Sequence, residues 1–353
     1  MGKKLKLGII GLGAIGKVHS DAYVANSKDA EIFAICDAMP ERVKEQGEKL
    51  GVKNTFTDYK KLLASDVDAV SICTGNTTHM EIAVAAFKAG KHVLVEKPMA
   101  MNAVQAAKIV EAATKSRKTL QIGMVWRQSA EARLVRKYVE DGVLGNIYHM
   151  RAVMIRRRGI PGLGGWFTTK AQSGGGPLID IGVHWFDIAM HLSGHWNPSS
   201  VSATCSGRFG SKMRDYKYVG MWAGPPNFNG VFDVEDHAMG MVRFGSKATM
   251  AFEISWAANA EEEMYVDLLG DKGGVRLFNG KPLKLLTEFN GNIADVNPQY
   301  ADNENRFHLQ AQKFIAACRG ECPPAATGKE GLTNMKLIDA VYASSKAGRE
   351  VKI

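Results

Sequence analysis

The fold of this chain is decided by its opening residues, LKLGII at positions 5–10 followed by GLGAIG at positions 11–16. The apolar run predicts a buried strand, and the glycine pattern predicts a tight turn into a helix. In such a turn Gly11 bends the chain, Gly13 lets the backbone approach a pyrophosphate, and Gly16 lets the helix pack on the strand. The unpaired N–H groups at the helix N-terminus favour a negative charge. The predicted nucleotide contacts here are Gly11, Leu12, Gly13, Ala14, Ile15 and Gly16.

A second apolar stretch, EIFAIC at positions 31–36, ends on Asp37. This acid lies about 20 residues past the last glycine, where a carboxylate accepts hydrogen bonds from the ribose hydroxyls of NAD. The same carboxylate would repel the 2′-phosphate of NADP. Arg42, about one turn further on, would weaken that preference, unless it is only a solvated arginine at a helix start. The sequence therefore predicts NAD as the cofactor, with NADP less favoured.

Length and composition predict a soluble enzyme-sized protein of two domains. The chain has 353 residues, of which 45% are hydrophobic and 23% charged, and each half can bury its own core. No apolar run reaches the roughly 18 residues that a membrane span needs. The short apolar stretch after Lys6 is a first strand rather than a signal peptide. We therefore expect no membrane partner.

The cysteine pattern and the net charge bear on the location of the protein and on the classes of partner it binds. Five cysteines are an odd number, and Cys36 and Cys73 fall in predicted core strands, which favours reduced thiols and a cytoplasmic location. Cys318 and Cys322 are four apart with no second pair, so no metal site is predicted. The net charge is +9, but no nucleic-acid recognition motif accompanies it. The expected partner is a small molecule.

The pattern of apolar segments changes near residue 126. Residues 1–126 alternate strand and helix, which predicts an α/β Rossmann domain with a doubly wound parallel sheet. Residues 127–353 predict an α+β domain with a large open, mostly antiparallel sheet covered on one face by helices. Its expected strands span residues 148–155, 201–205, 238–244, 249–256, 264–269 and 275–278, with helices near 130–140 and 178–192. The helical residues 304–348 are expected to pack back near the junction.

Two groups of polar residues could carry chemistry. Lys97 follows a predicted parallel strand at residues 92–95, at the carboxyl edge where open α/β sheets bind ligands. Asp180 and His184 are four residues apart on a helix that begins after Gly176-Pro177, and a histidine held by a carboxylate is a common general base. Judged alone, Lys97 would more often be an exposed lysine, and the Asp–His pair a surface contact.

A looser group offers arginine donors and tryptophan faces that suit an oxygen-rich substrate. For each of these residues taken singly, packing or a solvated ion pair is the more common role. The group consists of Trp126, Arg127, Arg157, Trp166, Asp236 and His237.

Four motifs occur in order along the chain: GLGAIG at 11–16, Asp37, GKHVLVEKP at 90–98 and GGPLIDIGVH at 175–184. Together they make the chain resemble the Gfo/Idh/MocA oxidoreductase family, which includes inositol and sugar dehydrogenases, over essentially its whole length. The resemblance implies a site between the two domains that holds Lys97, Asp180 and His184 as catalytic residues. It also implies a homodimer or homotetramer formed through the C-terminal sheet. One departure is Gly75, where the family more often has proline.

The resemblance and the looser group of residues together extend the predicted site. Cofactor contacts beyond the glycine turn, Asp37 and Arg42 are expected from Thr74, Gly75, Asn76, His79, Glu96, Lys97 and Arg127. Substrate contacts are expected from Lys97, Trp126, Arg157, Trp166, Asp180, His184 and His237.

Two reactions remain open at this point. The first is NAD-dependent oxidation of a secondary hydroxyl of a sugar, sugar derivative or cyclitol, with His184 as the general base. The second is elimination, hydrolysis or epimerisation of a sugar through a transient keto-sugar on a retained NAD, with no net redox change. A non-catalytic NAD sensor is disfavoured by the intact set of Lys97, Asp180 and His184.

Overall fold

The computed structural model describes residues 3–218, 220–278 and 280–353. Its first unit contains a six-stranded sheet in the order β3-β2-β1-β4-β5-β6, and every neighbouring pair is parallel. β1 has β2 on one side and β4 on the other, so the direction in which successive strands are added reverses at β1. Doubly wound sheets bind ligands at such a reversal. The strands are β1 (Leu5–Ile10), β2 (Ala30–Cys36), β3 (Asn54–Phe56), β4 (Ala69–Ile72), β5 (His92–Val95) and β6 (Leu120–Ile122).

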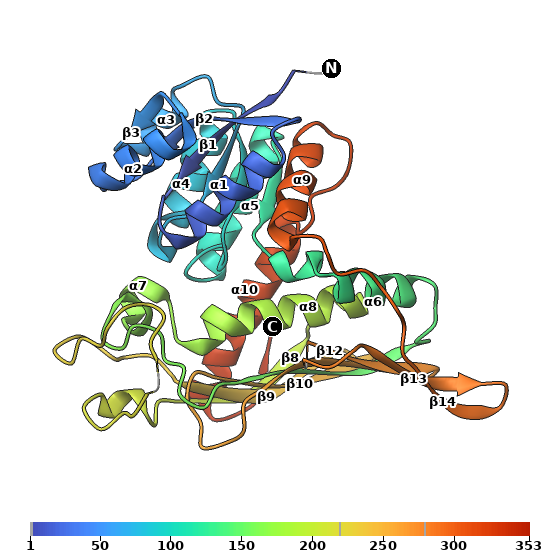
Figure 1. Cartoon of the computed structure of the whole chain (residues 1–353). Helices are drawn as coiled ribbons and strands as arrows, with labels where there is room; N and C mark the ends of the chain where they lie inside the picture. The colour runs from blue at the N-terminus through green and yellow to red at the C-terminus, as the bar shows by residue number, and fades with distance from the viewer. Residues whose placement is uncertain (1–2, 219, 279) are drawn as a thin grey trace. The chain divides into compact units, whose positions relative to one another are not determined.

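Apolar helix faces pack on this sheet because the strands are almost continuously hydrophobic. Leu7 and Ile9 of β1 are completely buried and share one cluster with Phe314, far away in sequence. The helix that carries Phe314 lies beside the first helix of the chain (Figure 1). The helices of this unit are α1 (Ala14–Ala25), α2 (Pro40–Leu50), α3 (Tyr59–Leu63), α4 (His79–Lys88), α5 (Ala103–Ser116) and α9 (Arg306–Cys318), with 3₁₀ turns η1 (Asn76–Thr78) and η2 (Val125–Gln128).

The second unit is built on a nine-stranded sheet in the order β14-β13-β12-β11-β7-β10-β9-β8-β15. Only the pair of β7 with β10 is parallel, which confirms the predicted mostly antiparallel sheet. The strands are β7 (Ile147–Ile155), β8 (Ser200–Ser206), β9 (His237–Phe244), β10 (Ala248–Ser255), β11 (Glu263–Gly270), β12 (Gly273–Leu277), β13 (Lys284–Phe289), β14 (Asn292–Val296) and β15 (Val351–Lys352).

Helices α6 and α8 lie side by side along one face of this sheet (Figure 1). Phe186 of α8 packs against Phe252 of β10, with ring centroids 4.9 Å apart. Phe252 is paired with Gly240 of β9, and paired residues share a sheet face. Met239 and Met241, on either side of Gly240, therefore point to the opposite face, where they are 49% and 37% exposed. The helical segments of this unit are α6 (Ala130–Glu140), η3 (Trp166–Thr168), α7 (Lys170–Ser173), η4 (Leu178–Gly182), α8 (Val183–Ser193), η5 (Gly210–Lys212) and most of α10 (Gly328–Ala347).

The C-terminal helices divide between the two units, each of which consists of two segments of the chain. The first unit consists of the chain up to Gln128 together with Asn303–Leu332, and the second of Ser129–Asp302 and Thr333–Ile353. The physical reason is burial, because Phe314 and Ile315 of α9 complete the hydrophobic cluster under β1. Within the described residues, no helix is long and apolar enough to cross a membrane.

Candidate active site

The turn between β1 and α1 has the shape that a dinucleotide requires. Gly11 has a φ of +94°, and a Cβ on it would lie 2.6 Å from the carbonyl oxygen of Cys73. A Cβ on Gly16 would lie 2.0 Å from the carbonyl oxygen of Gly11, so helix and turn touch backbone to backbone. At Gly13, by contrast, the nearest atom to such a Cβ is Arg42 Nη1 at 3.9 Å. The turn is closed on its inner side and open at Gly13, which fits a pyrophosphate at the N-terminus of α1.

Asp37 is held in a fixed orientation at the end of β2. Its Oδ2 accepts a hydrogen bond from the Leu12 N–H at 2.7 Å, and its Oδ1 accepts one from Met39 N–H at 2.9 Å. Arg42 Nη1 lies 3.6 Å from the same carboxylate. The Asp37 carboxylate thus connects the end of β2 to the glycine turn. The Arg42 guanidinium lies beside this carboxylate.

The loop after β4 carries Thr74, Gly75 and Asn76, and the ring of His79 contacts its first residue. One ring nitrogen of His79 lies 2.8 Å from the Pro98 carbonyl oxygen, and the other lies 3.0 Å from that of Thr74. Burial lowers the pKa of His79. Because both nitrogens contact the chain itself, we interpret His79 as a support for the loop rather than as a direct cofactor ligand.

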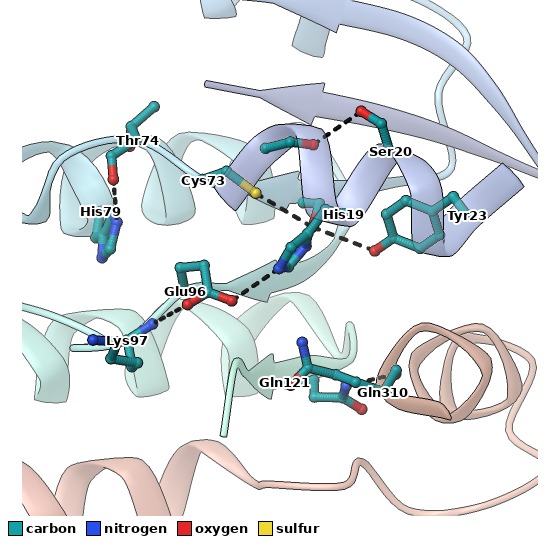
Figure 2. A network of polar contacts seen from close by, with 12 residues as sticks. His19, Ser20, Tyr23, Cys73, Thr74, His79, Glu96, Lys97, Gln121 and Gln310 are labelled. Carbon is teal, nitrogen blue, oxygen red and sulfur yellow. Dashed lines mark hydrogen bonds and ion pairs between the residues drawn. The ribbon is translucent and has the colours of Figure 1, made fainter. Parts of the chain in front are cut away.

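Glu96 takes part in a buried polar network that the sequence did not reveal (Figure 2). Its Oε1 lies 2.8 Å from Nε2 of His19 on α1, and its Oε2 accepts a hydrogen bond from the Lys97 N–H at 3.1 Å. The other nitrogen of His19 lies 2.7 Å from Ser71 Oγ. A Cβ on Gly123 would lie 2.5 Å from the Glu96 carboxylate. Glu96 is therefore enclosed, and its position fixes the backbone that presents Lys97.

Titration of His19 is coupled to this network. Burial lowers the pKa of His19, but Cys73 and Glu96 raise it to about 10. Burial likewise raises the pKa of Glu96, but contacts with His19 and then Lys97 more than reverse this, so that the pKa lies below its usual range. The geometry favours a charged imidazolium–carboxylate pair in the interior.

We expect the pair of His19 and Glu96 to make the free energy of unfolding depend on pH in the alkaline range. The folded-state pKa of His19 lies above the ordinary 6.5, so its contribution is complete below pH 6.5 and is lost as pH rises through about 10. The free energy of unfolding should fall over this range by at least about 1.4 kcal/mol more in the wild type than in His19→Gln. Denaturant titrations at several pH values measure the difference.

A matched control for that experiment is His92→Gln. Burial lowers the pKa of His92, so this histidine is neutral above pH 6.5 in both states and its removal should leave the slope unchanged. Parallel pH profiles for wild type and His19→Gln would contradict the charged pair.

Trp126 and Arg127 lie in η2 and hold the C-terminal part of the first unit. Arg127 is 3% exposed, and its Nη1 donates to the Ala325 carbonyl at 2.9 Å and to Glu330 at 3.1 Å. The guanidinium of Arg306 stacks on Trp126 at 4.1 Å. These contacts explain why residues 303–332 join the first unit, and they give both side chains a structural role.

In the second unit, Asp180 and His184 lie at the start of the predicted helix, but its first turn is a π-helix. This turn, η4, covers Leu178–Gly182 and leads directly into α8. Such turns are rare and often occur at functional sites. Trp256 Nε1 donates a hydrogen bond to Asp180 Oδ2 at 3.2 Å. The predicted pair is thus brought onto one continuous helical segment, with the carboxylate fixed by a buried indole.

Two residues that the sequence did not single out hold this π turn. Glu235 accepts hydrogen bonds from the N–H groups of Gly176 at 3.0 Å and Leu178 at 3.1 Å, and from the hydroxyl of Tyr342 at 2.9 Å. Burial raises the pKa of Glu235, and these three donors oppose the rise. At the other end, Asn334 Nδ2 of α10 donates to the Val183 carbonyl at 2.7 Å.

The remaining predicted substrate residues are dispersed. Trp166 lies in η3 and stacks on Phe167. Arg157 follows β7 and lines a surface cavity with Lys217 and Glu262, among others. His237 lies 3.0 Å from Glu253, on the sheet face opposite α8, so the structure does not bring it together with His184. Asp236 accepts the N–H groups of residues 208–210 and pins that loop.

No group of three His, Cys, Asp or Glu side chains suited to a metal ion occurs among residues 3–218, 220–278 and 280–353.

Comparison with known proteins follows the same division. Residues 5–124 match the family model described as the oxidoreductase family with an NAD-binding Rossmann fold, and residues 132–276 match the GFO/IDH/MocA C-terminal domain. The chain belongs to the Gfo/Idh/MocA oxidoreductase family. This confirms the predicted family, the α/β fold and an oxidoreductase with an NAD-binding domain.

Three relatives place the chain within this family. It is 33% identical to the D-glucoside 3-dehydrogenase of Escherichia coli (strain K12), covering 99% of this chain and 97% of that protein. It is 28% identical to the myo-inositol 2-dehydrogenase of Thermotoga maritima, covering 99% and 98%. The solved oxidoreductase domain protein from Kribbella flavida matches with a TM-score of 0.86 at 25% identity, over the full length of both chains.

Proposed function

We propose that this protein is an NAD-dependent dehydrogenase that oxidises a secondary hydroxyl of a sugar, sugar derivative or cyclitol. The observation that carries the proposal is the π turn that fixes Asp180 one turn before His184, in a chain that also has the oriented nucleotide turn of Gly13 and Asp37. The relatives support the substrate class, because those named above act on a glucoside and on an inositol.

The side chains divide the work as follows. His184 accepts the proton of the hydroxyl, and Asp180, held by Trp256, stabilises the resulting imidazolium. The Lys97 ammonium donates a hydrogen bond to the same oxygen and favours its loss of a proton. NAD, when bound, supplies the hydride acceptor. The carbon that loses its hydrogen with both electrons becomes a carbonyl carbon, which balances the reaction.

The test is formation of NADH across a panel of cyclitols, aldoses, anhydrosugars and glycosides, with NAD and NADP compared. Growth of NADH in proportion to one oxidised substrate is the expected result. A substrate that changes in mass or configuration with no net NADH would replace this proposal by redox-neutral chemistry on a retained cofactor. No change in any substrate would contradict both.

Asp37 is expected to set the choice of NAD over NADP. Replacing it by serine removes the charge that opposes a 2′-phosphate, and Arg42 then stands beside the ribose position. The ratio of kcat/KM with NADP to kcat/KM with NAD should rise by about tenfold or more, which corresponds to about 1.4 kcal/mol. Glu41→Gln, which removes an acid from the first turn of α2, should leave the ratio unchanged. An unchanged ratio in Asp37→Ser would contradict the assignment.

We also propose that the chain forms a homodimer or homotetramer through the uncovered face of the nine-stranded sheet. Met239, Met241 and Leu286 are between 37% and 50% exposed and lie on that face by strand register. Replacing Met239 and Met241 by lysine should shift the protein towards monomer in sedimentation experiments, because charge at the centre of an interface is costly. A wild-type monomer would contradict the proposal.

A further inference from the structure

Aromatic side chains form a continuous row in the second unit, and two of them, Phe167 and Trp222, have no role in the proposed reaction. Phe167 lies in the middle of this row. Its ring centroid is 3.8 Å from that of Trp166 at an interplanar angle of 31°, 5.1 Å from Trp222 at 70°, and 6.5 Å from Trp256 at 83°. The inner end, Trp256, is completely buried and donates its Nε1–H to Asp180. The row therefore starts at the proposed catalytic carboxylate.

The outer end of the row is open to solvent. Trp166 is 41% exposed and Trp222 is 66% exposed. A single exposed tryptophan needs no explanation, but here two of them contact the same half-buried ring, that of Phe167. Indole rings present a large, rigid and apolar face with a polar edge. We call Trp166, Phe167 and Trp222 the aromatic platform.

The loops that carry the platform are locked together. The N–H of Asn227 donates to the Leu163 carbonyl at 2.7 Å, and Thr168 Oγ1 donates to the Val231 carbonyl at 2.8 Å. A Cβ on Gly230 would lie 1.9 Å from the Gly164 carbonyl oxygen, so the two backbones are in direct contact. The platform is thus preorganised, which lowers the entropy cost of binding a ring against it.

The geometry points to a subsite for a second ring of the substrate. Resting on the proposed oxidation beside Asp180, we propose that the aromatic platform binds the aglycone of a glycoside, the group joined to the sugar that is oxidised. Two sources share the required chemistry, an aromatic aglycone and a second pyranose, since both present a flat face of C–H or π character to an indole.

The experiment compares substrates that differ only beyond the oxidised sugar. Phenyl β-D-glucoside and cellobiose each carry a second ring, whereas methyl β-D-glucoside does not. In Trp222→Ala, kcat/KM for the two-ring substrates should fall by about fivefold to tenfold, the usual size of one aromatic contact. The value for methyl β-D-glucoside should stay within about twofold. Loss for the phenyl compound alone identifies an aromatic aglycone, and loss for cellobiose alone identifies a second sugar.

Two controls accompany this comparison. Phe289→Ala removes an aromatic side chain of matched exposure, 67%, from β13 near the edge of the sheet, and it should not alter the ratio between substrates. Trp222→Phe retains a ring and should restore most of the preference. Equal losses for one-ring and two-ring substrates in Trp222→Ala would overturn the subsite.

A binding measurement separates failure of the subsite from failure of the proposed reaction. Calorimetry in the presence of NADH should show tighter binding of phenyl than of methyl β-D-glucoside to the wild type, with the difference abolished in Trp222→Ala. This readout does not require turnover. Binding without this preference would overturn the platform even if sugars are oxidised. The preference without any oxidation would retain the platform and reject the dehydrogenase.

Discussion

Replacing His184 by alanine is expected to lower kcat by about 10²–10⁴-fold, the range that general acid–base catalysis contributes. The reason is local: His184 lies in the first turn of α8, directly after the π turn that carries Asp180. Binding of NAD should be unchanged, because the glycine turn and Asp37 belong to the other structural unit. Steady-state kinetics on the substrate found by the panel, with NAD affinity from calorimetry, measure both quantities.

The pH profile adds a readout that a folding defect would not reproduce. In the wild type, kcat/KM should rise with pH as the general base loses its proton, and His184→Ala should lose that limb. His195→Gln is the matched control. His195 also lies in the second unit and contacts the Ile147 carbonyl at 2.9 Å, so its loss should affect stability but not the profile. Near-normal turnover in His184→Ala would reject it as the base.

The first unit could be predicted almost completely because its signals are local. A strand, a glycine turn and an acid at fixed spacing determine each other within about forty residues. The position of α9 could not be predicted in the same way. Phe314 reaches the cluster under β1 across about three hundred residues of sequence, and helical periodicity does not reveal which core a helix joins.

The sequence predicts the acid–base residues of the candidate site but does not reveal the side chains that hold them. The spacing of Asp180 and His184 suggests general acid–base catalysis, but nothing in GPLIDIG at positions 176–182 predicts a π turn. The resemblance predicts Glu96 as a cofactor contact, but no sequence pattern indicates its partner His19, which lies 77 residues away in sequence. A buried carboxylate such as Glu235 accepts hydrogen bonds from backbone N–H groups, which almost every residue type provides. Such contacts depend on tertiary packing rather than on residue type.

Replacing Glu235 or Asn334, the two residues that hold the π turn, is expected to lower activity strongly. Glu235→Gln keeps the size of the side chain but replaces one acceptor oxygen by an NH₂ donor. The remaining amide oxygen cannot take the place of both carboxylate oxygens, which together accept hydrogen bonds from Gly176, Leu178 and Tyr342. Asn334→Ala leaves the Val183 carbonyl without its side-chain partner. Either change should let the segment relax towards a regular α-helix and rotate Asp180 away from His184. We expect kcat to fall by about 10–100-fold, since small misplacements of catalytic groups have effects of this order.

Asp236→Asn provides the matched control for Glu235→Gln. Asp236 is the next residue, is completely buried, and also accepts backbone N–H groups, but those of Arg208, Phe209 and Gly210 rather than those of the π turn. Both variants should lose stability to a similar extent, because each removes charge-assisted hydrogen bonds of comparable strength. Only Glu235→Gln should lower kcat with KM for NAD unchanged and shift the pH profile assigned to His184. If the two neighbours behave alike in kcat and pH profile, the π turn is a packing feature, and the alignment of Asp180 with His184 must come from the helix itself.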